Sequence, residues 1–331
     1  MDTTGMNVNP VNLALEEVFI FHLSGLIQFV LFFKLTYYWP RFVEEWEKVE
    51  VNMRKYQVFT NLRLKLNLMT SCFMFYAIVE HSLVSAYKLK KWIDSSQNTS
   101  EALQNYFVET YDHVFTYVNY SLWIGLALQY FNLQRTFNWS FADVTIMLIG
   151  TALTFRLKQM SRRIERISTL KVNNINQWKV VRKDYIRLTE LCYEVNTRLS
   201  TIIMISFLTN MYFVLLQIFL SMNPMENLVQ KIYFYLSFGL ILIRIVGLCV
   251  FGGAVYEEWR NLGFLLNCVV TTTYNQEVER MACHVISWEL SLSGKNFFHI
   301  SRSLILKIAG AVVTYELVLI QFYRNAQYNS M

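Results

Sequence analysis

Long apolar stretches recur along the chain of 331 residues and are separated by polar connections. A helix of about 20 predominantly apolar residues is long enough to cross the hydrocarbon core of a bilayer. Six stretches come close to this length: Val18–Tyr38, Leu64–Tyr87, Phe141–Leu157, Leu199–Ser221, Ile232–Val255 and Leu304–Tyr323. All three prolines lie outside these stretches, so we expect long and largely unkinked helices. The pattern predicts an all-α fold, a polytopic membrane helical bundle with six spans.

A shorter apolar patch, Val114–Phe131, lies in the connection between the second and third stretches. It carries four side chains that can form hydrogen bonds, Tyr117, Asn119, Tyr120 and Gln129. Polar groups in hydrocarbon are costly unless they find partners or water. We therefore interpret this patch as an interfacial or re-entrant helix rather than a seventh span.

Positive charge gathers in two connections and predicts how the helices cross the membrane. Segments 39–63 and 158–198 are rich in lysine and arginine, whereas residues 1–33 and 221–230 contain none. The positive-inside rule places the two basic segments in the cytoplasm and both chain ends outside. Three glycosylation sequons fall in the segment predicted to be extracellular, at Asn98, Asn119 and Asn138.

The basic segment 158–198 also has a helical pattern. Apolar residues recur every three or four positions, at Val181, Tyr185, Leu188, Leu191 and Val195. An apolar stripe of this kind needs a packing partner. We favour the interpretation that the third and fourth spans extend beyond the membrane as helices and pack together there. The alternative is a solvated helix in a cytoplasmic loop.

Composition agrees with a membrane protein and argues against other classes. Apolar residues make up 54% of the chain and charged residues 16%, whereas a soluble domain has about a quarter of its residues charged. The net charge of +6 reflects the lysine and arginine residues gathered in the two basic connections, and it does not indicate nucleic acid as a partner. The five cysteines and five histidines are dispersed, so we expect no metal site and no structural disulfide. No catalytic or nucleotide-binding motif occurs, so we expect neither enzymatic activity nor a cofactor.

Several spans carry polar side chains toward their predicted outer halves. Such groups must face the bundle interior or a cavity. The candidate ligand-binding residues are Glu80, His81, Trp139, Asp143, Asn210, Tyr212, Gln217 and Tyr235. Carboxylate, amide, hydroxyl and aromatic faces together suit a polyhydroxylated ligand such as a sugar. For any single residue, hydrogen bonding between helices is an equally good explanation. The deeper Arg244 is expected to pair with a carboxylate such as Glu316 or Glu80.

The last apolar stretch is unusually polar for a span and reads KIAGAVVTYELVLIQF. On a helix, Thr314, Val318 and Gln321 share one narrow sector, and Phe322 lies on its flank. This sector is suited to lining a water-filled path. Glu316 points away from it, toward neighbouring helices.

The same stretch resembles a known family. Residues 314–322, TYELVLIQF, are similar to the TYxxxxxQF signature that ends insect gustatory receptors, and most similar to their sweet-taste branch. Four further stretches resemble that branch: FKLTYYWPRFVEEWEKVE (33–50), TFNWSFADVTIMLIG (136–150), ISFLTNMYFVLLQ (205–217) and LSGKNFFHISR (292–302). The similarity extends from about residue 19 to residue 323, nearly the whole chain.

The resemblance implies a tetrameric, ligand-gated cation channel of seven-helix subunits in the plasma membrane of chemosensory neurons. Its partners would be a mono- or disaccharide, permeant cations, membrane lipid, and related gustatory receptors in a homo- or hetero-tetramer. The sugar would bind from outside, among the helices of residues 18–257. By the same resemblance, Thr314 and Val318 line the pore, and Gln321 and Phe322 lie at its gate.

The remaining segments follow from the same comparison. A cytoplasmic anchor region corresponds to residues 258–303 and the pore helix to 304–323, with extracellular segments at 1–17 and 324–331. The family's last helix is split, and its cytoplasmic part corresponds to Ala282–His299. The family's first helix has no counterpart, because Val18–Tyr38 matches its second. We interpret the sequence as a partial gene model or a shortened isoform.

Two other classes of multi-span protein are alternatives. A G-protein-coupled chemoreceptor should carry an acidic-Arg-Tyr motif after its third helix and NPxxY in its last, and neither motif occurs. A secondary transporter of a small polar solute should show internal repeats or helices broken by glycine and proline. The spans contain no proline and show no repeat, so the receptor interpretation is favoured.

Overall fold

The computed structural model describes residues 10–57, 61–222 and 228–329, and these residues are almost entirely helical. Six of the described helices are long and apolar enough to cross a membrane, which confirms the expected all-α bundle. In chain order the elements are α1 (Pro10–Met53), α2 (Leu62–Ser95), α3 (Thr99–Thr110), α4 (Asp112–Phe115), α5 (Leu122–Thr169), α6 (Ile175–Ser221), α7 (Leu228–Gly247), the π-helical segment η1 (Leu248–Gly252), α8 (Gly253–Asn267), α9 (Gln276–Ser287), β1 (Ser293–Gly294), β2 (Phe298–His299) and α10 (Ser303–Asn329).

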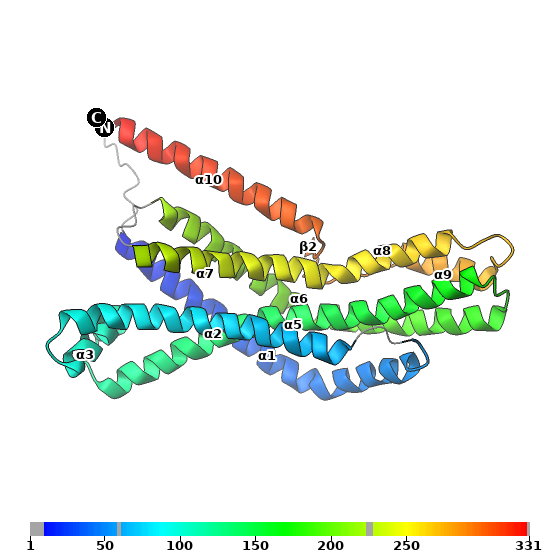
Figure 1. Ribbon diagram of the computed structural model, residues 1–331, viewed down its shortest axis with the longest axis horizontal. Coiled ribbons are helices and arrows are strands. Elements are labelled where there is room, and N and C mark those ends of the chain that lie inside the picture. The colour runs from blue at the N-terminus through cyan, green and yellow to red at the C-terminus, as the bar shows by residue number, and fades with distance from the viewer. Residues whose placement is uncertain (1–9, 58–60, 223–227, 330–331) are drawn as a thin grey trace.

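The long helices run back and forth between two ends of an elongated molecule (Figure 1). One end, which we call the basic end, contains the connection between α5 and α6, helix α9 and the last turns of α1. The other end, the cavity end, contains α3 and α4, the last turns of α2 and α6 and the first turns of α1.

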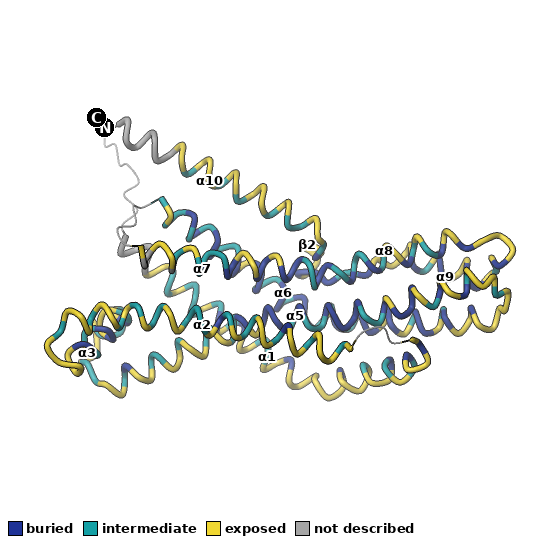
Figure 2. Tube along the Cα trace, viewed as in Figure 1, coloured by how far each residue is buried: buried dark blue, intermediate teal, exposed yellow. Residues whose placement is uncertain are grey.

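The basic end holds the densest apolar core (Figure 2). Helices α5 and α6 continue past their apolar spans and pack against α8 and α9 there. The predicted stripe on α6 is buried at every position: Val181, Tyr185, Leu188, Leu191 and Val195. The prediction that the two spans extend as packed helices is therefore confirmed.

Two expectations about the helices are wrong. The patch Val114–Phe131 is not one re-entrant helix, because α4 ends at Phe115 and the residues from Leu122 onward begin α5. Gln129 is held within the bundle, where its Oε1 accepts hydrogen bonds from the hydroxyls of Tyr106 and Tyr111 at 3.1 and 2.8 Å, whereas Tyr117 and Asn119 are exposed. Pro40 lies inside α1, which continues to Met53.

The segment expected to form the cytoplasmic part of the last helix is only partly helical. Helix α9 ends at Ser287, and the strands β1 and β2 then pair antiparallel in a short hairpin. Lys295 and Asn296 at the turn have positive φ angles of 51° and 61°, which an α-helix does not allow. The hairpin is attached to α6, because the Ser293 backbone N–H donates to Asn196 Oδ1 at 2.8 Å.

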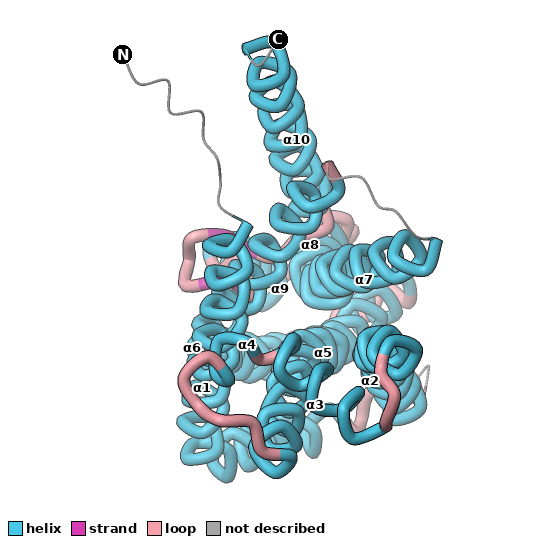
Figure 3. Tube along the Cα trace, turned by 90° about the vertical axis from the view of Figure 1, so that its left-hand side faces the viewer, coloured by secondary structure: helices cyan, strands magenta, loops and turns pink. Residues whose placement is uncertain are grey.

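Helix α10 stands apart from the other spans, as the view from the cavity end shows (Figure 3). None of its membrane-spanning window is buried, whereas 67% of the corresponding window in α5 is. One face packs on the bundle through partly buried residues: Leu304, Ile305, Ile308, Val312, Tyr315 and Leu319. The opposite face of α10 is free in the single chain.

Candidate ligand cavity

A cavity of about 310 Å³ opens among the helices at the cavity end. Five long helices contribute side chains at helical spacing, so each presents one stripe to the interior. On α7, for example, the lining residues are Ser237, Leu240, Ile241 and Arg244. The ionisable and aromatic residues of the wall include Glu17, Phe21, His22, Glu80, His81, Lys88, Tyr111, His113, Trp139, Phe213 and Arg244.

Among the described residues, ten buried side-chain atoms lack a hydrogen-bond partner, and four of them belong to residues that line this cavity. These four atoms are His22 Nδ1, His81 Nε2, Gln217 Oε1 and Arg244 Nη1. Buried polar groups are nearly always paired, and an orphan group costs about 1–3 kcal/mol. A ligand that carries several hydroxyl groups can donate to the amide oxygen and accept from the guanidinium nitrogen. The wall is therefore suited to a polyol.

The other atoms of these side chains are held by neighbouring helices. Gln217 Nε2 donates to Ser237 Oγ at 3.1 Å, which fixes the amide between α6 and α7. His81 Nδ1 lies 3.4 Å from Thr136 Oγ1, which links α2 to α5. The unpaired atoms are thus held in place before a ligand arrives.

Behind the wall lies a buried polar network around Asp143. Its carboxylate accepts a hydrogen bond from the Ser206 hydroxyl, and Asn210 Nδ2 lies 3.2 Å from both carboxylate oxygens. Arg244 Nη1 lies 3.9 Å from Asp143 Oδ2, and Arg244 Nη2 donates to Ser140 Oγ at 2.5 Å. A buried charge is tolerated when it is paired in this way. The network ties α5, α6 and α7 together.

Trp139 connects this network to the cavity. Its Nε1 donates to Asn210 Oδ1 at 3.1 Å, and the Arg244 guanidinium lies over its ring at 4.6 Å from the centroid. Phe213 packs against the same ring with centroids 4.9 Å apart. The indole is therefore fixed on several sides and forms a rigid part of the wall.

The structure brings together half of the predicted ligand residues. Glu80, His81, Trp139 and Gln217 line the cavity. Asp143 and Asn210 are only 1% and 0% exposed and lie in the network behind the wall. Tyr212 packs edge-on against Phe213, and Tyr235 is 68% exposed on the outside of α7. Ligand contact remains a prediction for the first four residues.

Arg244 pairs differently from our expectation. Its ion pair is with Asp143, although Glu80 also exerts an electrostatic effect on it. Glu316 is exposed on α10. The sequence separated the two residues because Asp143 lies two positions inside its predicted span and Arg244 twelve positions inside its own. Their pairing depends on how α5 and α7 are placed side by side, which hydropathy does not give.

Several lining residues carried weaker sequence signals. Glu17 directly precedes the first apolar stretch, and His22 lies inside it five positions later. His113 comes from α4, and its ring centroid lies 6.0 Å from that of His22. Lys88 lies on α2 two turns beyond His81, on the same helical face. A search for polar residues at helical spacing that included the residues flanking each span would find Glu17, His22 and Lys88.

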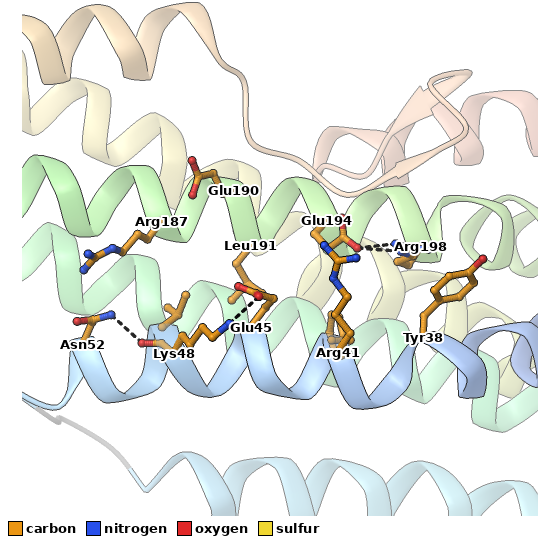
Figure 4. Close-up of a pocket in the computed structure, with 12 residues that line it drawn as sticks. Tyr38, Arg41, Glu45, Lys48, Asn52, Arg187, Glu190, Leu191, Glu194 and Arg198 are labelled. Carbon is orange, nitrogen blue, oxygen red and sulfur yellow. Dashed lines mark hydrogen bonds and ion pairs between the residues drawn. The ribbon is translucent and has the colours of Figure 1, made fainter.

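A second hollow, at the basic end, has a different character. It is a groove of about 520 Å³ between α1 and α6, with charged side chains on both walls (Figure 4). Lys48 Nζ lies 2.9 Å from Glu45 Oε1, and Arg198 Nη2 lies 2.8 Å from Glu194 Oε1. These groups already pair within each helix. The groove therefore has fewer free hydrogen-bonding groups for a polyol than the cavity has.

The predicted sequons lie in different surroundings. Asn98 precedes α3 and Asn119 precedes α5, and both side chains are exposed. Asn138 lies inside α5, where its Nδ2 donates to the Gly25 carbonyl oxygen at 3.1 Å. The amide nitrogen that would carry a glycan is therefore engaged between α1 and α5. Glycosylation remains a prediction, which this geometry favours at Asn98 and Asn119.

The predicted pore residues lie on the free side of α10. Thr314, Val318 and Gln321 are all exposed, and the Thr314 hydroxyl donates to the Gly310 carbonyl oxygen at 2.9 Å. The Phe322 side chain lies outside the described residues. Among the residues that the structure describes, no group of three or more His, Cys, Asp or Glu is arranged to hold a metal ion.

Comparison with known proteins agrees with these features. The trehalose receptor family profile matches residues 4–330. The Drosophila melanogaster gustatory receptor for sugar taste 64f is 30% identical over 322 residues, which are 96% of this chain and 68% of that receptor. The gustatory receptor 5a for trehalose, from the same species, is 31% identical over 314 residues, covering 93% of this chain and 70% of that receptor.

The fold has a solved counterpart. The insect olfactory receptor OR5 from Machilis hrabei, in complex with eugenol, matches with a TM-score of 0.62 at 15% sequence identity, covering 92% of this chain and 80% of that one. At this identity the match shows a shared fold. The family profile and the sequence relatives confirm the resemblance noted in the last apolar stretch. The chain therefore belongs to the trehalose receptor family, among the sugar receptors of the insect gustatory receptors.

Proposed function

We propose that this protein is a sugar receptor of chemosensory neurons and acts as a ligand-gated cation channel in the plasma membrane. The observation that carries the proposal is the cavity wall, in which four buried polar atoms have no hydrogen-bond partner among the described residues. Hydroxyl groups of a mono- or disaccharide would complete these hydrogen bonds. The printed functions of the relatives, sugar taste and trehalose reception, support the same ligand class.

The free face of α10 supports the channel part of the proposal. That face carries Thr314 and Gln321 in an otherwise apolar span, and polar side chains in a membrane need polar partners or a water-filled space. In a tetramer of this chain or of related receptors, Thr314, Val318 and Gln321 would line the conduit. Gln321 and Phe322 would form its gate near the outer end. Residues 258–303 would serve as the cytoplasmic anchor where subunits meet.

Opening then requires differential affinity. A sugar can shift the gate only if it binds the open arrangement more tightly than the closed one. Completing the hydrogen bonds of Gln217 and Arg244 in one arrangement of α6 and α7 would supply that difference. The helices would carry the change to α10, and the widened constriction would admit hydrated cations.

Recording from the full-length chain in a heterologous cell tests the proposal. Trehalose, sucrose, maltose, glucose and fructose would be applied outside, and whole-cell and excised-patch currents measured. We expect at least one sugar to evoke unitary cation currents in excised patches, where soluble second messengers are absent. Saturable sugar uptake without unitary currents would indicate a transporter. Responses that need intact G-protein signalling would indicate a coupled receptor.

A further inference from the structure

A π-helical segment interrupts the long helix that passes the cavity. Residues Leu248–Gly252 form η1, which joins α7 to α8 without a break in the chain direction (Figure 1). Leu248, Cys249 and Gly252 are buried. A π-helical turn holds one more residue per hydrogen-bonded ring than an α-helical turn, and such turns are frequent at functional sites. The segment lies between two features that the proposed function needs.

Arg244 lies immediately before this segment. Leu248 follows it by four positions, which is about one helical turn. Arg244 lines the cavity; its buried Nη1 has no hydrogen-bond partner among the described residues and lies 3.9 Å from Asp143 Oδ2, while Nη2 donates to Ser140 on α5. Any ligand oxygen that binds Nη1 would therefore act on α7 at the point where the π-helical segment starts.

On its other side the segment touches the entry to α10. A Cβ placed on Gly253 would lie 2.9 Å from Ser301 Cα, so the two backbones are in direct contact. A Cβ placed on Gly252 would lie 3.4 Å from the Ile300 side chain. Helix α10 begins at Ser303, two residues after Ser301. Movement at η1 therefore reaches the first turn of α10 without an intervening element.

The third side of the segment is fixed on α5. A Cβ placed on Gly150 would lie 2.8 Å from the Phe251 carbonyl oxygen and 2.9 Å from Gly252 Cα. Because α5 is the most buried of the spans, it forms a rigid support at this point. The π-helical segment is thus held between a fixed helix and the entry to the helix proposed to line the pore.

We infer that Arg244 couples the ligand cavity to α10 and that the π-helical segment Leu248–Gly252 is the joint through which it acts. The inference rests on the proposed function, since it names the internal link between sugar and gate. A π-helical turn has a discrete alternative, the α-helical pairing, and a change between the two displaces the residues that follow. Gly253 passes that displacement to Ser301. A ligand oxygen on Nη1 biases the choice because it draws Arg244 away from Asp143.

A reversible cross-link tests the joint. The double variant Gly252→Cys/Ile300→Cys places two thiols within the span of a disulfide, across the contact between η1 and the entry to α10. We expect the reduced variant to respond to the most effective sugar of the panel above. After a membrane-permeant oxidant, the evoked current should fall at least about tenfold, the scale of an allosteric coupling. Sugar binding to the purified receptor should persist, and reduction should restore the current.

The matched control joins the same helix elsewhere. In Gly263→Cys/Val285→Cys a thiol on α8 faces α9, because a Cβ on Gly263 would lie 3.6 Å from Val285 Cγ1. This cross-link leaves η1 and the entry to α10 free, so the response should survive oxidation. If the oxidised Gly252→Cys/Ile300→Cys receptor responds like its reduced form, the inference that η1 is the joint is wrong. The reduced form also reports whether the variant folds.

A second variant tests Arg244 without a cross-link. Arg244→Lys keeps a cation near Asp143 but removes the second guanidinium nitrogen. We expect the maximal current per surface receptor to fall by about tenfold, whereas a lost ligand contact alone would only raise the half-maximal sugar concentration. A shift in half-maximal concentration with an unchanged maximum overturns the role of Arg244. A native chain that binds sugar but passes no current defeats the proposed channel function itself, and this outcome is visible without any variant.

Discussion

The two ends of α5 and α6 are built differently although the same helices form both. At the basic end, Trp178 and Leu188 are 0% exposed and belong to an apolar core shared with α5, α8 and α9. At the cavity end, Trp139 and Gln217 border an open volume and polar atoms without partners. One end of each helix is close-packed, and the other is held mainly by hydrogen bonds around a hollow.

This difference shows how a membrane receptor can keep a binding site that is not optimally stable. Unpaired buried groups and an open cavity both cost free energy of folding. A dense apolar core at the opposite end can offset that cost, because helices of 48 and 47 residues join the two ends rigidly. Stability and ligand response should therefore separate along the helices. Substitutions at the basic end should change stability, and substitutions in the cavity wall should change the ligand response.

The largest effect should come from Trp178→Ala at the basic end. Trp178 is fully buried, and its Nε1 donates to the Val172 carbonyl oxygen at 3.3 Å. Removing the ring leaves a cavity that costs about 3–5 kcal/mol of unfolding free energy. Thermal unfolding in detergent micelles measures the loss. Trp288→Ala is the control, because Trp288 is 55% exposed at the same end; equal losses for the two variants would contradict the assignment of the core.

A smaller effect, confined to the ligand response, is expected from Gln217→Leu in the cavity wall. The variant keeps the side-chain volume but removes the unpaired Oε1 and the hydrogen bond to Ser237. The half-maximal sugar concentration should rise about tenfold, equivalent to ~1.4 kcal/mol. Dose–response currents at matched surface expression measure it. A loss of thermal stability as large as that of Trp178→Ala would remove the proposed separation between the two ends.

The sequence predicted the spans and the packed extension on α6 because both are repeated patterns. Hydropathy sums over about 20 residues, and the stripe from Val181 to Val195 repeats several times. The turn at Lys295 and Asn296 rests on a few backbone angles instead. The π-helical segment is equally local, and its sequence LCVFG looks like ordinary apolar span. Such features are decided by tertiary contacts, here the approach of Gly150 and Ser301 to the backbone.

The sequence predicted where along the helices the candidate site lies better than it predicted which side chains face it. The polar residues were correctly expected near one end of the bundle, but a residue's position along a helix does not say which way its side chain points. Ser237, Leu240, Ile241 and Arg244 form one stripe on α7 that faces the cavity. Tyr235 lies two positions from Ser237, which places it on the opposite side of the helix. Helical phase would have separated these residues.

A modest loss of stability is expected from Tyr56→Phe at the basic end. The Tyr56 hydroxyl donates to Asp184 Oδ2 at 2.7 Å, and this carboxylate is 3% exposed. Lys55 Nζ also lies 2.6 Å from the same oxygen and compensates in part. The unfolding free energy should fall by about 1 kcal/mol, with the sugar dose–response curve unchanged. Tyr37→Phe, at a residue 82% exposed on α1, is the control that should change neither quantity.

The smallest effect should follow from Tyr235→Ala, and it tests the boundary of the cavity. Tyr235 is a residue type suited to binding a sugar and lies near the same end of the bundle as the cavity. Its side chain is nevertheless 68% exposed on the outer side of α7. A truncation at an exposed position should change stability by no more than about 0.5 kcal/mol, and the half-maximal sugar concentration should stay the same within error. Currents from Tyr235→Ala and Gln217→Leu, recorded side by side, make the comparison. If Tyr235→Ala shifted the sugar response as far as Gln217→Leu does, the ligand would have to reach the outer face of α7, and the cavity among the helices would not be where sugar binds.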